Sequence, residues 1–157
     1  MMKIAVAFDH AGFELAGAIA DELRGGGHDV KRIGPEAGSQ ADYPDVGAEA
    51  ARRVAKGEFD AGVFICGTGV GMSIVANKVP GVRAALCTSE YMAEMARRHN
   101  DANVLCLGAR VVGKGLALGI LRAFLNAGFD GGRHARRVSK IADVERCSAD
   151  GAQGPRG

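Results

Sequence analysis

Short apolar runs alternate with helical patterns along this chain, and the alternation limits the possible folds more than any other feature. Five runs of strand length occupy residues 4–8, 30–33, 62–66, 82–87 and 104–107. Helical spacing occupies residues 13–23, 45–56, 72–78, 89–99 and 113–127. In the fourth of these helices, Ser89 is expected to form the N-cap, and Met92, Met95 and Ala96 are expected to share one face. Strands and helices that alternate in this way are typical of βαβ units and a parallel sheet. We therefore expect a three-layer α/β/α fold with a five-stranded parallel sheet.

The chain is long enough for one such domain. It has 157 residues, of which 47% are hydrophobic, so it can form a substantial core. A last, basic helix is predicted at 133–146, and a segment rich in Gly and polar residues follows it. We expect a single domain over residues 1–147 and a disordered tail over 148–157. No apolar run approaches the ~18 residues of a membrane span, so no membrane association is expected.

Charge and cysteine content narrow the function classes. The net charge is +2, from 20 basic and 18 acidic residues, which does not favour a nucleic-acid partner. The four cysteines form no CxxC pair, so no metal site is expected, and Cys87 and Cys106 lie in apolar runs typical of buried thiols. A strand pattern begins almost at the first residue, with no signal peptide before it, which favours a cytoplasmic location.

Open parallel sheets bind ligands beyond the carboxyl ends of their strands. Polar or reactive residues flank three of the predicted strands: Asp9 and His10 follow the first, Cys66 and its loop follow the third, and His99 and Asn100 precede the fifth. We expect all of them to lie at the ligand-binding edge.

The loop after the third predicted strand has glycine at positions 67, 69 and 71. Such a loop lets backbone N–H groups approach an anion, and the next helix adds the positive end of its dipole. The alternative is a tight strand-to-helix turn without a ligand. Met72 occupies the place of the third glycine of a dinucleotide fingerprint, and there is no Walker lysine.

Three further features indicate chemistry. Cys66 directly precedes the glycine loop, an environment that favours a reactive thiolate, although a buried inert cysteine is the alternative. His99 ends a predicted helix, where it could donate a proton or serve only as a C-terminal cap. Arg133 and Arg137 share a helix face and suit a phosphate dianion, although a solvated face is equally compatible. Together they indicate a small phosphorylated substrate.

Seven blocks of the sequence, in order, closely resemble the type B ribose-5-phosphate isomerases. This family includes the galactose-6-phosphate and allose-6-phosphate isomerases. The resemblance extends from residue 3 to about 146. Its blocks are Asp9–Phe13, Asp42–Pro44, Ile65–Ser73, Ala76–Lys78, Arg98–Val104, Gly108–Gly113 and Gly131–His134.

The resemblance implies a Rossmann-like fold and an aldose–ketose isomerase that uses no metal and no cofactor. It implies that Cys66 is the base and His99 the ring-opening acid, and that Thr68 and the backbone of Gly67, Gly69, Val70 and Gly71 hold the enediolate. The sugar would contact Asp9, His10, Tyr43 and Asn100, and the phosphate would contact Arg110, Arg133, His134 and Arg137. Family members form homodimers or tetramers with active sites shared between subunits.

Two alternatives remain open at the level of sequence. The first is an isomerase of hexose 6-phosphates of the allose or galactose type, because the loop near residues 34–43 sets the depth of the pocket. The second is a noncatalytic module that uses the glycine loop to bind a phosphate or a nucleotide.

Overall fold

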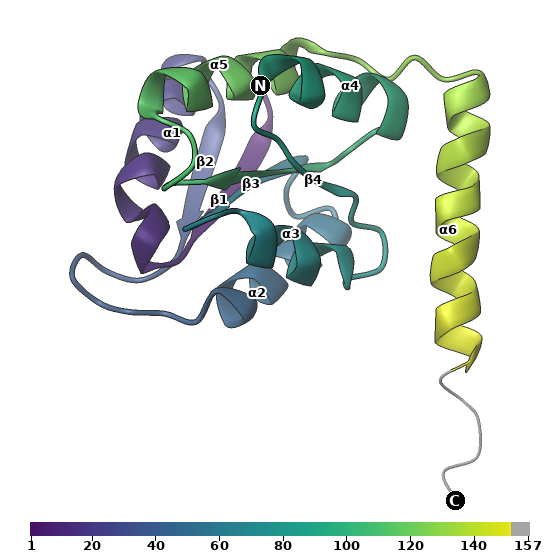
Figure 1. Cartoon of the computed structure of the whole chain (residues 1–157), viewed down its shortest axis with the longest axis horizontal. Helices are drawn as coiled ribbons and strands as arrows, with labels where there is room; N and C mark the ends of the chain where they lie inside the picture. Colours follow the sequence, from purple (N-terminus) through teal and green to yellow (C-terminus); the bar gives the residue numbers. More distant parts are fainter. Residues whose placement is uncertain (152–157) are drawn as a thin grey trace, which may run out of the picture.

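Five parallel strands form one sheet with helices on both faces, as the sequence predicts. The computed structural model describes residues 1–151 (Figure 1). The strands are β1 (Lys3–Phe8), β2 (Asp29–Ile33), β3 (Ala61–Cys66), β4 (Ala84–Leu86) and β5 (Val104–Gly108). The helices are η1 (His10–Gly12), α1 (Phe13–Gly25), α2 (Tyr43–Ala55), α3 (Val70–Asn77), α4 (Glu90–Asn100), α5 (Lys114–Asn126) and α6 (Arg133–Gly151).

The strand order is β2-β1-β3-β5-β4, and every neighbouring pair is parallel. The chain leaves β1 toward β2 on one side and returns to β3 on the other, so the topological switch point lies between β1 and β3. In open parallel sheets the ligand cleft lies outside the carboxyl ends at such a point. Asp9 follows β1 and Cys66 ends β3, so both lie at this cleft.

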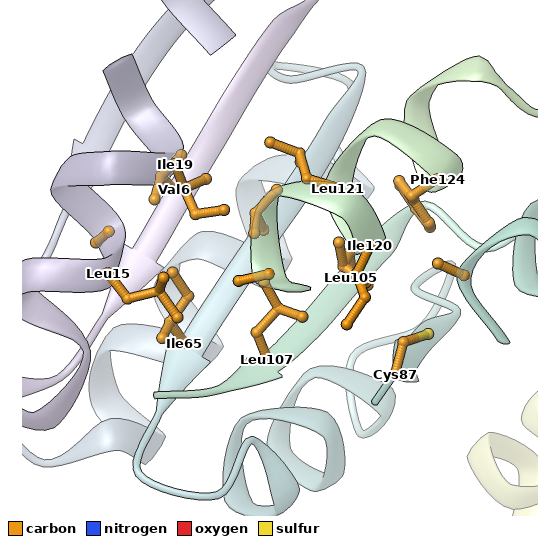
Figure 2. Close-up of a cluster of buried hydrophobic side chains, with 14 of the residues drawn as sticks. Val6, Leu15, Ile19, Ile65, Cys87, Leu105, Leu107, Ile120, Leu121 and Phe124 are labelled. Atoms are coloured by element: carbon orange, nitrogen blue, oxygen red, sulfur yellow. The ribbon is translucent and has the colours of Figure 1, made fainter. Parts of the chain in front are cut away.

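Two apolar layers hold the helices against the sheet. On one face α1, α4 and α5 pack over side chains such as Val6, Ile65 and Leu105 (Figure 2). On the other face α2 and α3 cover a second cluster that includes Phe64 and Cys106. Because strands β1, β3 and β5 are buried on both faces, they are apolar at almost every position.

The edge strand β4 is shorter than the apolar run 82–87 predicts. Asn77 replaces a neighbouring strand along part of it: its side chain donates to the Ala84 carbonyl at 2.9 Å and accepts from the Ala84 N–H at 2.9 Å. Asn103 accepts from the Arg83 N–H at 2.8 Å in the same way. These side chains satisfy both backbone groups of Ala84 and the N–H of Arg83, so this stretch of the sheet edge is not left unpaired.

The buried face of α4 also differs from the prediction. The sequence placed Met92, Met95 and Ala96 on one face, whereas Ala93 and Ala96 are the buried residues and Met92 is exposed. Small side chains at this contact let α4 approach α5 closely. The expected cap at Ser89 is confirmed, since its hydroxyl accepts from the Met92 N–H at 3.2 Å.

The last helix, α6, stands beside the sandwich and is reached through a link that follows α5 (Figure 1). It ends at Gly151, so the tail expected over 148–157 is wrong for its first four residues. Helical hydrogen bonding continues there, with the Ser148 hydroxyl donating to the Val144 carbonyl at 3.0 Å. The remainder of the expected tail, 152–157, lies outside the described residues. Among residues 1–151, no helix combines the length and apolar character needed to cross a membrane.

Candidate active site

The Cys66 thiol lies where β3 ends and the glycine loop begins. The residue is 4% exposed, and the Gly69 N–H donates to its sulfur at 3.2 Å. Gly69 has φ of +77°, a conformation that turns its N–H back toward the strand end. The Thr68 hydroxyl accepts from the Val70 N–H at 3.2 Å, where α3 starts. A thiol beside a directed amide and a helix N-terminus is an arrangement that stabilises negative charge on sulfur.

Two side chains predicted to bind substrate lie directly against this loop. A Cβ at Gly71 would meet the Tyr43 ring at 2.5 Å, and a Cβ at Gly67 would meet the Arg110 guanidinium at 3.1 Å. The backbone N–H of Arg110 also donates to the Gly67 carbonyl at 2.9 Å. The glycines therefore make room for Tyr43 and Arg110 as well as for a ligand.

Asp9 and His10 lie at the same edge of the sheet. The Asp9 N–H donates to the Ile65 carbonyl at 3.2 Å, which joins it to the residue before Cys66. One oxygen of its buried carboxylate accepts from the N–H groups of Ala11 at 3.0 Å and Gly12 at 3.2 Å. Asp9 thus caps η1 with one carboxylate oxygen. Its other oxygen is the one available for the predicted contact with the sugar. His10 is exposed and lines a cavity of about 380 Å³ beside residues 36–40.

A second group of predicted site residues gathers around two histidines. The rings of His99 and His134 are stacked, with centroids 4.1 Å apart and an interplanar angle of 4°. Burial lowers the pKa of His134, and the nearby His99, Arg133 and Arg137 lower it further, while Asp130 raises it. Asn100 lines a cavity of about 770 Å³ between α6 and the start of β4, together with the exposed Ile141 and Val144 of α6.

The two groups lie at opposite edges of the sheet, so the expectation of a single cluster is wrong for one chain. His99 and Asn100 precede β5, whereas the Cys66 loop adjoins its far end, where Cys66 pairs with Gly108. A five-residue strand separates these edges by about 13 Å, at about 3.3 Å per residue. In Figure 1, α4 ends on the side of α6, and β5 runs away from it. In an all-parallel sheet, residues that precede a strand lie at one edge, and residues that follow a strand lie at the opposite edge.

The histidine group has the donor atoms of a metal site but not its geometry. Donor atoms of His99, Asp130 and His134 lie within 4.8 Å of one another. The two rings are stacked nearly parallel, so their in-plane lone pairs run side by side instead of converging on an ion. The arrangement is that of two imidazoles facing a carboxylate.

Two further thiols are Cys106 in β5 and Cys87 just after β4, and both are the buried cysteines that the sequence predicts. Burial raises the pKa of Cys87 to about 11, and it raises the pKa of Cys106 more strongly. Neither thiol is available as a base near neutral pH. Cys66 differs from both in its contact with a loop N–H.

Sequence reasoning missed Arg98 and Asp130. The Arg98 Nε donates to both carboxylate oxygens of Asp130 at 3.2 Å, beside the stacked histidines. This hydrogen bond is the main cause that lowers the pKa of Asp130. The sequence does contain a signal, because two residues of opposite charge precede the two predicted histidines. Arg98 directly precedes His99, and Asp130 precedes the Gly131-Gly132 turn before His134.

Comparison with known proteins gives consistent results. The profile of the Ribose/Galactose Isomerase family matches residues 4–141. Ribose-5-phosphate isomerase B of Escherichia coli (strain K12) is 47% identical over 93% of this chain and 98% of that protein. The solved structure of ribose-5-phosphate isomerase B from Clostridium thermocellum has a TM-score of 0.92 and 53% identity, covering 94% of this chain and 99% of that one. The Mycoplasma genitalium ribose-5-phosphate isomerase B, solved with bound ribulose-5-phosphate, has a TM-score of 0.88 and 44% identity over 92% and 96%.

Proposed function

Because the chain belongs to the ribose/galactose isomerase family, we propose that it interconverts ribose 5-phosphate and ribulose 5-phosphate through an enediolate. The observation that carries this proposal is the Cys66 thiol at the switch point of the sheet, 3.2 Å from the Gly69 N–H. Abstraction of a proton next to a carbonyl requires a positioned base and N–H donors for the oxygen on which charge develops, and the glycine loop places further N–H groups next to this thiol.

The Cys66 thiolate removes the C2 proton of the open-chain aldose and returns it to C1, while a proton moves between the two oxygens. Charge that develops on the enediolate oxygen is stabilised by the N–H groups of the 67–71 loop and by Thr68. Asp9, His10 and Tyr43 contact the sugar, since all three lie at the same edge of the sheet as Cys66. One base moves one proton between neighbouring carbons, so the reaction needs neither a redox cofactor nor a metal.

The remaining roles need a second copy of the chain. His99 would open the furanose ring, Asn100 would contact the sugar, and Arg133, His134 and Arg137 would bind the phosphate together with Arg110. These residues, apart from Arg110, lie a strand length away from Cys66 of the same chain. Exposed apolar side chains on α3 (Val70 and Ile74) and α6 (Ile141 and Val144) provide surface for such an assembly. The active unit is therefore a homodimer or a multiple of it.

The free thiols fit a cytoplasmic enzyme. Cys66, Cys87 and Cys106 are buried and unpaired, and Cys147 is exposed without a partner in the described residues. Reduced thiols in this number are typical of a reducing compartment.

The proposed activity is tested with purified protein in a coupled isomerase assay on ribose 5-phosphate, allose 6-phosphate and galactose 6-phosphate. The expected result is turnover of the pentose phosphate with the highest kcat/KM, unchanged by EDTA. Preference for a hexose phosphate would move the enzyme to the allose or galactose branch. Stabilisation by nucleotides without turnover of any sugar would instead indicate the noncatalytic module.

A further inference from the structure

Asp130 ties the start of α6 to the end of α4 at two points. Its N–H donates to the Arg98 carbonyl at 3.0 Å, and its carboxylate accepts from the Arg98 Nε with both oxygens at 3.2 Å. Two glycines with positive φ, Gly131 and Gly132, then turn the chain into α6. This turn brings His134 onto the ring of His99. The position of His134 therefore depends on where Asp130 is held.

The Asp130 carboxylate also offers the stacked rings a negative charge. It lies within 4.8 Å of donor atoms on both imidazoles. The other charged groups acting on His134 are positive: Arg133 and Arg137 on α6, and the imidazole of His99 on α4. Arg98, also on α4, is itself neutralised by Asp130 and by Glu94, whose carboxylate accepts from it at 3.1 Å. Among the charged groups that face the histidine pair, the Asp130 carboxylate is therefore the one that stabilises a proton on an imidazole.

We propose that Asp130, oriented by Arg98, is a positioning residue of the isomerase that holds His134 against His99 and provides the counter-charge for a protonated imidazole pair. The inference rests on the proposed function for the role of His99, since ring opening requires an imidazole that carries a proton. Asp130 touches neither the substrate nor the reacting atoms in this role. It acts through the two histidines.

The direction of the pH effect follows from the sign of the charge. An imidazole that acts as an acid works while it is protonated and stops working as pH rises through its titration. A nearby carboxylate favours the protonated form, so its removal shifts this loss of activity to lower pH. Burial together with His99, Arg133 and Arg137 already lowers the pKa of His134, and Asp130 opposes them.

The first test compares pH profiles of kcat/KM for Asp130→Asn, Asp130→Glu and the unaltered protein. In Asp130→Asn we expect the basic limb to move to lower pH by about one unit, because removing an opposite charge at this distance has an effect of that size. Asp130→Glu retains the charge and should restore most of the shift. Glu94→Gln is the matched control, because Glu94 binds the same Arg98 without belonging to the histidine group. It should leave the limb in place.

A uniform loss of activity in Asp130→Asn, with the basic limb unmoved, would overturn the counter-charge role and leave only a structural one. The second test separates this inference from the proposed function. Titration of the His134 C–H resonances by NMR, without substrate, should show a lower midpoint in Asp130→Asn than in Glu94→Gln. An unchanged midpoint would refute the inference even in an active isomerase. A shifted midpoint in a protein without isomerase activity would support the interaction and refute the proposed function.

Discussion

Cys66 is buried like Cys87 and Cys106, and it differs from them by its contact with a loop N–H at the end of β3. Cys87 and Cys106 are buried in apolar layers, which raises their pKa values, whereas Cys66 contacts the Gly69 N–H at the mouth of the switch point. All three side chains belong to the core, and Cys66 is in addition a candidate base. Placement of the sulfur relative to a backbone donor decides between these roles.

Cys66→Ala should lower kcat by about 10²- to 10⁴-fold, the usual contribution of a positioned general base. Binding of ribose 5-phosphate, measured by calorimetry, should persist because the phosphate contacts remain. Cys147→Ser is the control, since Cys147 is an exposed thiol on α6, and it should remain fully active. In this control background, iodoacetamide should inactivate the enzyme through Cys66. Near-complete activity of Cys66→Ala would remove this residue from the role of base.

Arg137→Ala should raise KM for the sugar phosphate by about 10- to 100-fold, since a hydrogen bond to a charged group contributes about 1.5–3 kcal/mol. Arg136→Ala is the matched control, because Arg136 precedes Arg137 directly and is also exposed on α6, but it is not among the residues predicted to bind the phosphate. Steady-state kinetics on both variants separate a phosphate contact from a general effect of positive charge. Equal KM values for the two variants would exclude Arg137 from the phosphate site.

At the scale of elements, the loop between β3 and α3 depends on a residue without a side chain. Gly69 has φ of +77°, and a Cβ there would lie 2.5 Å from the Leu86 side chain and 2.8 Å from the Leu107 carbonyl carbon. Both the backbone conformation and the space therefore exclude other residues. This loop also directs the N–H group that contacts Cys66.

Gly69→Ala should lower the free energy of unfolding by about 2–4 kcal/mol, through strained backbone and overpacking, and should also reduce kcat. Gly17→Ala offers the opposite case, because Gly17 lies inside α1 and an added methyl group there would have nothing within 4 Å. It should raise the free energy of unfolding by about 0.5–1 kcal/mol. Urea unfolding of both variants measures the two changes. A neutral Gly69→Ala would contradict the close packing of this loop.

Most elements could be predicted from the sequence because each has a clear local pattern. Continuous apolar runs correspond to β1, β3 and β5, and the glycines at 25–27 end α1. The errors occur where tertiary contacts decide. The strand β4 spans Ala84–Leu86, and the Arg83 N–H before it donates to the Asn103 side chain, a contact that no apolar pattern shows. In α4, contact with α5 selects alanines for the buried face, so the larger Met92 is exposed.

At the scale of the whole molecule, the site could be predicted only in part. The residues of the carboxyl edge meet as expected, because each follows a strand or lies next to the loop after β3. His99, by contrast, precedes β5, and a parallel sheet places it at the opposite edge. The stacking of His99 on His134 depends on a turn and an ion pair that have no periodic signature.

The shared site predicts that two inactive variants complement each other. Cys66→Ala and His99→Ala should each be inactive, but mixing them under conditions that exchange subunits should restore activity. Equal amounts of both should give about a quarter of the wild-type activity, because half of the dimers are mixed and each has one intact site. Two copies of Cys66→Ala mixed in the same way provide the control. Failure to complement, with subunit exchange verified by mass spectrometry, would contradict a shared site.

Because all strands of the sheet are parallel, its two edges carry different residues. This difference affects how the activity of the enzyme depends on protein concentration. In the proposed site, the residues at the two ends of the strands of one chain are incomplete halves that face away from each other. In the proposed assembly, a freshly synthesised chain is therefore silent until it meets another. Below the dissociation constant of the pair, the rate varies with the square of the chain concentration, so halving expression removes about three quarters of the flux.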